Sequence, residues 1–254
     1  MTELELLQRA TSFRKIKDVV TANVLSSTLK QQLHQNRHLT ALYLAQLSYF
    51  SFAKISTKLS EFGAVRMSLY NHNGTQGFFA EFTDMAVVSF RGTQLDDKAD
   101  LKTCFTFWKE SYGEVKVHKG FANAIRNLIP NIMTDLSHVA DHKRVYFVGH
   151  SLGGALATLL TVKVKPDELV TFGAPRVAGP ELEVYLSDVE HHRITTKYDL
   201  VRLLPPHIPY ALPYMHTGKE RVLDVPWSWN PKKFIHPHLL ITYLNALMEE
   251  ENIM

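Results

Sequence analysis

The stretch that decides the fold is VYFVGHSLGGALATLL, residues 145–160. Its first four residues are apolar and mostly β-branched or aromatic, as in a buried strand, and its last residues are small and apolar, as in a tightly packed helix. Between them, Gly149 to Gly153 follow the pattern G-x-S-x-G, which places a serine on a sharp turn from a strand to a helix with its hydroxyl exposed. The pattern is short, so its meaning comes from the strand before it and the helix after it. We therefore predict that Ser151 is a nucleophile.

Outward from this stretch, helices and strands alternate. The pattern predicts a helix over residues 120–140, strands over 145–148, 168–172 and 193–196, and helices beyond Ser151 and over about 179–187. Strands separated by helices favour a parallel sheet that is covered on both faces. The sequence therefore predicts an α/β fold of the α/β-hydrolase type, with a mostly parallel central sheet and helices on both faces.

The two ends of the chain add further elements. Apolar residues recur at helical spacing over residues 28–52, which predicts one or two amphipathic helices. Strand-like runs over 64–70, 77–82 and 85–90, with a turn signal at residues 71–74, predict a hairpin that leads into a buried strand. The proline-rich region 203–237 is expected to be irregular, and an amphipathic helix over 239–248 is expected to close the chain.

Length and composition restrict the class of protein. The 254 residues fit one domain over 1–254, with 1–38 as a helical extension, and 45% hydrophobic residues are typical of a globular protein. A net charge of +3 without a basic run argues against nucleic acid as a partner. Cys104 is the single cysteine, so no intramolecular disulfide is expected. Neither a signal peptide nor an apolar stretch of roughly 18 residues is visible. We therefore expect a soluble protein, cytoplasmic or exported by a non-Sec route.

A serine hydroxyl needs a histidine to take its proton and a carboxylate to orient that histidine. In this fold the chain order is serine, acid, histidine. Asp188, Asp199 and Asp224 all follow plausible strands. Asp199 is the best placed, because it ends a strand where the chain passes into a loop at the carboxyl edge of the sheet, whereas Asp224 fits a surface charge better.

The chain has 13 histidines, so the general base must be identified by its position in the sequence. His238 follows the proline-rich loop and directly precedes the terminal helix, a place from which a loop residue can reach the serine. His236 is its main rival. The other downstream histidines are expected to belong to loop structure (His207 and His216) or to be ordinary surface or edge residues (His191 and His192).

At these residues the chain resembles the class 3 lipase family, typified by filamentous fungal triacylglycerol lipases. The resemblance runs from about Leu39 to Leu247. Its landmarks are VSFRGT at 88–93, VHKGF at 117–121, GHSLGGALA at 149–157, TFGAPR at 171–176, Asp199-Leu200-Val201 with LPP at 204–206, HTG at 216–218, and His238 with Tyr243 behind it. The landmarks stand in the family's order, which makes the resemblance more specific than one motif.

The resemblance implies an oxyanion hole made by Thr93 and by the backbone N–H of Leu152. Without it, Thr93 would be interpreted as a turn residue at a strand end. It also implies structural roles for Arg91, His118 and His216. Arg202 departs from the family, which often has proline there, and the disulfides of secreted fungal members are absent.

The family usually places a lid directly after the oxyanion residue, which corresponds here to residues 94–108. This segment carries charged residues first and then Cys104, Phe105, Phe107 and Trp108. A lid has one polar and one apolar face and opens at a lipid surface. The alternative is a charged surface turn followed by an aromatic cluster of the core, and both interpretations stay open.

These observations predict a serine hydrolase that cleaves carboxylic ester bonds of lipids, a triacylglycerol lipase or carboxylesterase. Ser151, His238 and Asp199 would act through an acyl-enzyme, and Thr93 and Leu152 would hold the oxyanion. No cofactor or metal is implied. The expected partner is a lipid ester at a lipid–water interface, with neither nucleic acid nor a transmembrane segment. The alternatives are a phospholipase, a feruloyl-type esterase and a non-catalytic lipid-binding protein.

Overall fold

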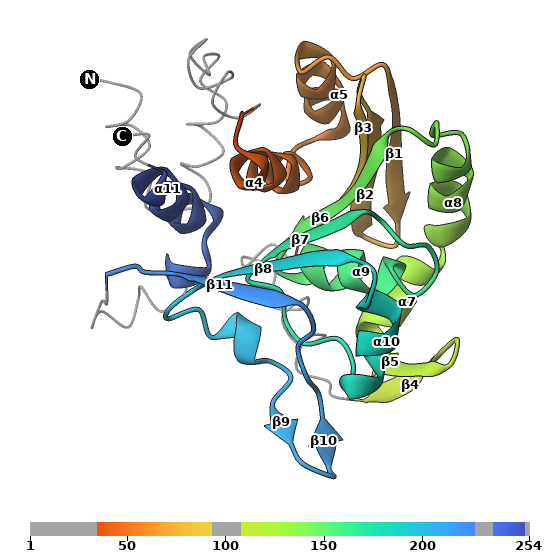
Figure 1. Cartoon of the computed structure of the whole chain (residues 1–254). Coiled ribbons are helices and arrows are strands. Elements are labelled where there is room, and N and C mark those ends of the chain that lie inside the picture. The colour runs from red at the N-terminus through yellow and green to blue at the C-terminus, as the bar shows by residue number, and fades with distance from the viewer. Residues whose placement is uncertain (1–34, 93–107, 227–235, 252–254) are drawn as a thin grey trace.

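A seven-stranded sheet forms the centre of the molecule in the computed structural model, which describes residues 35–92, 108–226 and 236–251 (Figure 1). The strand order is β1-β2-β3-β6-β7-β8-β11. Neighbours from β3 to β11 run parallel, while β1, β2 and β3 form an antiparallel meander. The strands are β1 (Arg66–His72), β2 (Thr75–Glu81), β3 (Met85–Phe90), β6 (Arg144–His150), β7 (Glu168–Phe172), β8 (Glu190–Thr196) and β11 (Lys219–Leu223). The predicted α/β fold with a mostly parallel sheet is confirmed.

Helices cover both faces of this sheet (Figure 1). One face carries α4 (Arg37–Leu47), α5 (Phe52–Glu61) and α11 (Leu240–Glu250), and the other carries α7 (Lys119–Arg126), α8 (Ile129–Ser137) and α9 (Leu152–Leu160). Successive strand residues point to opposite faces, so Val87 packs into the first apolar layer and Val88 into the second. The sheet is therefore buried on both sides, and polar side chains reach solvent or a site mainly at the strand ends.

Local sequence explains where several elements begin and turn. The Asn36 side chain accepts hydrogen bonds from the backbone N–H groups of His38 and Leu39, which caps α4. The β1–β2 hairpin turns at Asn73 and Gly74, both with positive φ (48° and 82°), as the favoured two-residue hairpin turn requires. The predicted turn over residues 71–74 was thus too long, because Asn71 and His72 still pair with β2.

The helix predicted over residues 120–140 is wrong as a single element. The structure contains α7 and α8 instead, separated at Asn127 and Leu128. Pro130 lies in the first turn of α8, where its missing N–H breaks no helical hydrogen bond. The apolar period alone does not reveal this break, because both helices bury residues in the same layer.

Smaller elements fill the connections. Residues 109–118 form the ribbon β4 (Lys109–Tyr112) and β5 (Val115–His118), and the helix predicted over 179–187 is a 3-10 turn (Pro180–Leu182) followed by the short α10 (Glu183–Leu186). The 3-10 turn η2 (Val201–Leu203) leads into the region 203–237. That region was expected to be irregular, but it contains the hairpin β9 (His207–Ile208) and β10 (Leu212–Pro213) and the sheet strand β11. A further 3-10 turn, η4 (His236–His238), precedes α11.

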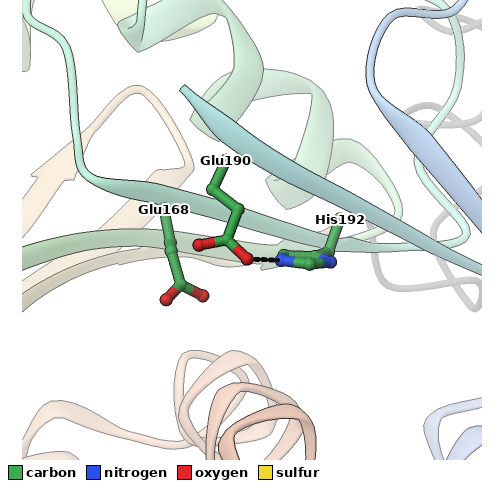
Figure 2. A group of neighbouring side chains, drawn as sticks. All are labelled: Glu168, Glu190 and His192. Carbon is green, nitrogen blue, oxygen red and sulfur yellow. Dashed lines mark hydrogen bonds and ion pairs between the residues drawn. The ribbon is translucent and has the colours of Figure 1, made fainter. Parts of the chain in front are cut away.

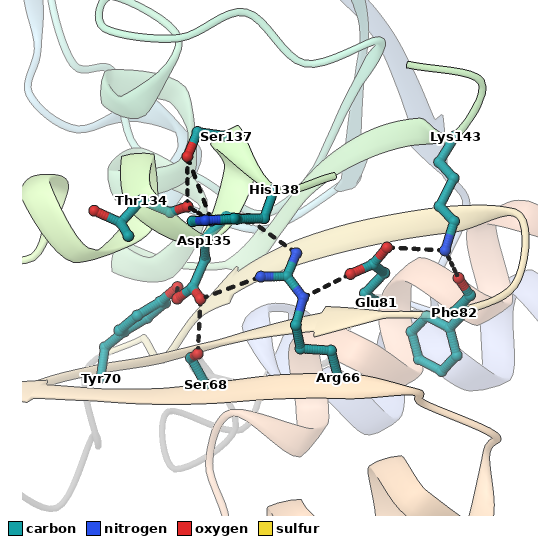
Figure 3. A network of polar contacts seen from close by, with 10 residues as sticks. All are labelled: Arg66, Ser68, Tyr70, Glu81, Phe82, Thr134, Asp135, Ser137, His138 and Lys143. Atoms are coloured by element: carbon teal, nitrogen blue, oxygen red, sulfur yellow. Dashed lines mark hydrogen bonds and ion pairs between the residues drawn. The ribbon is translucent and has the colours of Figure 1, made fainter. Parts of the chain in front are cut away.

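A polar network fastens α8 to the meander (Figure 3). The carboxylate of Asp135 accepts hydrogen bonds from the hydroxyls of Ser68 (2.9 Å) and Tyr70 (2.5 Å) on β1. Arg66 donates to Glu81 at 2.7 Å and to the backbone oxygen of Asp135 at 3.0 Å. This network lies at the antiparallel strands of the sheet and contains none of the predicted site residues. We therefore interpret it as a structural contact between α8 and the meander.

Three sequence-based expectations fall wholly or mainly outside the described residues. They are the N-terminal extension over 1–38, the lid over 94–108 and any role of Cys104. Trp108, at the end of the lid segment, is described and is 77% exposed. Within the described ranges, every helix is too short or too polar to cross a membrane.

Candidate active site

Ser151 occupies the turn between β6 and α9. Its backbone has φ 58° and ψ −131°, a conformation that costs free energy in any residue other than glycine. The Ser151 N–H donates to the carbonyl of Phe172 at the end of β7 (2.9 Å), which holds the turn against the neighbouring strand. The structure therefore places Ser151 on the strained strand-to-helix turn that the motif predicts.

Close packing explains the two glycines that flank this serine. A Cβ atom on Gly153 would lie 2.1 Å from the carbonyl oxygen of Phe90 on β3. A Cβ atom on Gly149 would lie 2.3 Å from the carbonyl carbon of Gly153. Since real Cβ atoms do not approach so closely, the helix can start beside the strands only with glycine at both positions.

Asp199 and His238 form a buried pair at the same edge of the sheet. Asp199 follows β8, and His238 ends η4. His238 Nδ1 lies 2.7 Å from Asp199 Oδ2, with exposed fractions of only 2% and 1% for the two residues. The hydroxyl of Tyr243 on α11 also donates to Oδ2 (2.6 Å), and the Val201 N–H donates to Oδ1 (2.9 Å).

These contacts decide the charge of Asp199. Burial by itself would raise the pKa of the Asp199 carboxyl, but the positive charge of protonated His238 and hydrogen bonds from His238, Tyr243 and Val201 outweigh it and hold the pKa below its usual value. The carboxylate is therefore ionised at neutral pH, so Nδ1 of His238 carries the proton and donates it. The Nε2 atom is then the ring nitrogen that does not contact Asp199.

The nucleophile and this pair meet at the end of β7. The Ser151 N–H is hydrogen-bonded to the carbonyl of Phe172. The next residue is Gly173, and a Cβ atom there would lie 2.5 Å from Asp199 Oδ2 and 2.9 Å from His238 Nδ1. Nε2 of His238 is buried and has no hydrogen-bond partner among the described residues. The structure thus brings Ser151, Asp199 and His238 around one strand end, with the basic nitrogen of the histidine unoccupied.

Two backbone segments border the serine where an oxyanion would form. Leu152 is the first residue of α9, so its N–H has no partner within the helix. Gly92 follows β3, and a Cβ atom there would lie 3.1 Å from Ser151 Cβ. Thr93, the other expected donor, directly follows Gly92 but lies outside the described residues.

The rival acids and bases lie elsewhere. Asp188 and Asp224 have highly exposed side chains (75% and 84%) and pair with Lys165 and Lys197.

The remaining histidine candidates bond to other groups: His236 to Thr242, His207 to the Tyr214 carbonyl and His216 to the Arg202 carbonyl. His118 caps α7 by accepting from the Phe121 N–H, and Arg91 donates to Gln76.

The expectation that His191 is a surface or edge residue is wrong. His191 is 6% exposed, with Thr171 and Thr217 at 3.5 and 3.4 Å. Burial, followed by the charges of Arg193 and the neighbouring histidines, lowers its pKa to about 3. The histidine is inside because β11 covers β8 on its outer side, a pairing between segments distant in sequence.

Sequence reasoning also left three residues around the triad without a role, although Tyr243 and His150 stand among the quoted landmarks. It gave no role to Tyr243, which donates to Asp199, or to Tyr49 and His150, which bond to each other at 2.8 Å. The available signal for Tyr243 was its place in the landmark that begins at His238. His150 occupies a variable position of the motif, and Tyr49 lies 101 residues away from it in sequence, so neither had a local signal.

A second cluster of titratable side chains lies at the amino ends of β7 and β8. Glu168, Glu190 and His192 have ligand atoms within 4.8 Å of one another (Figure 2). Arg144 lies 2.8 Å from Glu168, and Arg37 lies 3.1 Å from Glu190. Because two guanidinium groups already compensate the two carboxylates, we interpret this group as an ionic cluster.

Comparison with known proteins agrees with this geometry. Residues 87–210 match the model of the class 3 lipase family, which supports the family resemblance of the motifs in this segment. The fold is shared with solved lipases. One is a fungal lipase–inhibitor complex described as a model for interfacial activation (TM-score 0.60, 21% identity, 76% of this chain and 80% of that one). Another is a triacylglycerol lipase from Penicillium expansum (TM-score 0.58, 17% identity, 78% and 81%).

Curated relatives match over shorter segments. Secreted mono- and diacylglycerol lipase 1 of Fusarium solani is 33% identical over 117 residues, which is 42% of this chain and 34% of the relative. Toxin TseL of Vibrio cholerae is 32% identical over 102 residues, 38% of this chain and 16% of the toxin. The chain thus spans about a third of the length of the first relative and about a sixth of the second.

Proposed function

We propose that the protein is a serine hydrolase that cleaves carboxylic ester bonds of lipids, as a triacylglycerol lipase or carboxylesterase. The observation that carries this proposal is the buried Asp199–His238 pair, joined at 2.7 Å, beside a serine in a strained turn. The family match and the lipase names of several relatives support the same class of substrate.

The arrangement suits acyl transfer. His238 takes the Ser151 proton on Nε2 as the hydroxyl attacks the ester carbonyl, and the Asp199 carboxylate stabilises the imidazolium that forms. The N–H groups of Leu152 and Thr93 hold the oxyanion of the tetrahedral intermediate. The imidazolium then protonates the leaving alcohol. Water, activated by the same histidine, releases the carboxylic acid from the acyl-enzyme.

Exposed apolar side chains in the segment that follows Asp199 support a lipid as the substrate. Leu200, directly after Asp199, is 57% exposed, and Leu203 is 42% exposed. The β9–β10 hairpin projects from the body of the molecule (Figure 1) and carries Ile208 (45%) and Tyr210 (fully exposed). Several exposed apolar side chains in one short segment are consistent with contact to an apolar partner.

The substrate proposal has a direct test. Hydrolysis of p-nitrophenyl esters from acetate to palmitate is measured for the wild type and for Ser151→Ala. We expect activity that rises with chain length and is lost in the variant. Wild-type activity on short esters alone would move the assignment to a carboxylesterase, and inactivity on every ester would favour the lipid-binding alternative.

The lid proposal, for residues 94–108, is tested with a triglyceride. If a lid covers the site in water, activity rises abruptly when the substrate passes its solubility limit. A smooth hyperbolic curve through that limit would contradict the lid and would leave the alternative of a surface turn with a core cluster.

A further inference from the structure

A chain of hydrogen bonds crosses the nucleophile turn and ends on the backbone of the general base. The Tyr49 hydroxyl lies 2.8 Å from His150 Nδ1, and His150 Nε2 lies 2.7 Å from the carbonyl oxygen of His238. His150 is 1% exposed and directly precedes Ser151. These hydrogen bonds thus link the motif to the backbone of His238 and not to its side chain.

The partners fix the tautomer of His150. A carbonyl oxygen can only accept, so Nε2 of His150 must carry a proton. Burial, with the neighbouring His238 charge, lowers the pKa of His150 to about 3, so the ring is neutral and Nδ1 bears a lone pair. Tyr49 therefore donates its hydroxyl proton to Nδ1. Each bond in the chain has one allowed direction.

At its other end, this series of hydrogen bonds reaches the segment that is expected to form the oxyanion hole. The Gly92 backbone bonds to the Tyr49 hydroxyl, and a Cβ atom on Gly92 would lie 2.1 Å from it. Tyr49 follows α4, whose end is joined to β3 by hydrogen bonds from Ser48 to the Phe90 carbonyl (3.1 Å) and from Ser89 to the Leu44 carbonyl (3.2 Å). Helix α4, which precedes the residues matched by the family model, is thereby fixed to two strand ends of the site.

We infer that Tyr49 and His150 are positioning residues that set the geometry of His238. The inference rests on the proposed function, because it assigns these residues to the same hydrolytic site. Asp199 and Tyr243 fix the rotation of the His238 ring, while His150 fixes the backbone from which that ring projects. Tyr49 keeps His150 in the tautomer that can donate to the His238 carbonyl.

The first test compares two replacements of His150. Gln keeps a buried donor for the His238 carbonyl and an acceptor for Tyr49, whereas Leu removes both. We expect His150→Gln to keep kcat within about tenfold of wild type, and His150→Leu to lower kcat at least about 100-fold with KM changed less than about threefold. Equal losses in both variants, or a change confined to KM, would overturn the positioning role.

The second test uses a smaller change that should not prevent folding. Tyr49→Phe removes one hydroxyl, and Tyr43→Phe is the matched control, because Tyr43 is a buried tyrosine of α4 that stacks on Phe62. We expect kcat to fall about tenfold in Tyr49→Phe and to stay unchanged in the control. Equal kcat values in the two variants would overturn the role of Tyr49.

A third readout does not depend on hydrolysis. Nitrogen-15 NMR of the histidine rings is expected to show His150 as the neutral Nε2–H tautomer from pH 5 to 8 and His238 with its proton on Nδ1. In His150→Leu, the His238 signals should shift or broaden while those of a distant histidine stay unchanged. An Nδ1–H tautomer of His150, or an unchanged His238, would overturn the inference even if every ester assay failed. Inactivity of the wild type alone would overturn only the proposed function.

Discussion

The two ends of strands β7 and β8 hold titratable groups in opposite ways. At the amino ends lie Glu168, Glu190 and His192 (Figure 2). The two carboxylates pair with Arg144 and Arg37, whose side chains are about half exposed (51% and 49%). At the carboxyl ends, Asp199 and His238 are buried and receive directed hydrogen bonds from Tyr243 and Val201.

The difference separates two uses of charge. At the amino end each carboxylate, buried Glu168 and exposed Glu190, pairs with a half-exposed guanidinium group. Because water reaches the guanidinium group, such a pair contributes little free energy and constrains the geometry weakly. Buried hydrogen bonds with one allowed direction fix geometry strongly, because an unpaired buried group is costly. Substitutions at the carboxyl ends should therefore affect catalysis, whereas substitutions at the amino ends should affect only stability.

Replacing Asp199 should have the largest effect. Asp199→Asn removes the charge that orients His238 and stabilises its protonated form, so kcat for p-nitrophenyl esters should fall about 10⁴-fold. Glu168→Gln, the matched change of a buried carboxylate at the amino end, should leave kcat unchanged. A loss below tenfold in Asp199→Asn would assign the acid elsewhere.

Acidification should lower stability through two buried histidines, His150 at the carboxyl end of β6 and His191 near the amino end of β8. Burial lowers the pKa values of His150 and His191 to about 3, so between about pH 6.5 and 3 the unfolded chain takes up protons that the folded protein does not. Stability should therefore fall as the pH drops below 6.5, by about 1.4 kcal/mol per pH unit for each histidine. Urea denaturation at pH 7 and pH 5 measures this change. Equal free energies of unfolding at the two pH values would contradict the buried neutral state of both rings.

Removing the Tyr243 hydroxyl should have a smaller effect on catalysis. Tyr243→Phe leaves one lone pair of buried Asp199 without its donor at 2.6 Å, which should lower kcat about tenfold, equivalent to about 1.4 kcal/mol. Phe should fill the same space, so thermal denaturation should show the same cooperative transition. An unchanged kcat would mean that His238 and Val201 suffice to hold the carboxylate.

The smallest effect is expected at the amino end. Glu168→Gln weakens the pair with Arg144 at 2.8 Å, but the half-exposed guanidinium can turn to water, so the loss should be about 1 kcal/mol or less. The loss should shrink at high salt, because screening weakens exposed ion pairs. A loss that is large and independent of salt would show that this cluster, too, depends on buried directed contacts.

The sequence predicts the features that depend on neighbouring residues and on chain order. The strand over 145–148, the turn at Ser151 and the helix after it follow from one continuous stretch. Asp199 and His238 follow from the order of acid and histidine and from their places after a strand and before a helix. These two remain predictions as triad members, although the structure places them together.

Features that depend on distant segments could not be predicted in the same way. The break at Asn127 and Leu128 leaves the apolar period intact, and His191 is buried only because β11 pairs beside β8. The contact of Tyr49 with His150 needs α4, β3 and β6 to be placed together in space. Such contacts arise from tertiary packing, which no short sequence window contains.

The central claim is that Ser151 is an activated nucleophile in a buried triad. The most direct measurement is the reaction of the protein with a fluorophosphonate, followed by mass spectrometry of its peptides, for the wild type, Ser151→Ala and His238→Ala. Our account predicts one adduct, on Ser151, absent from Ser151→Ala and formed far more slowly in His238→Ala. A wild-type protein without an adduct, or with the adduct on another residue, would contradict it.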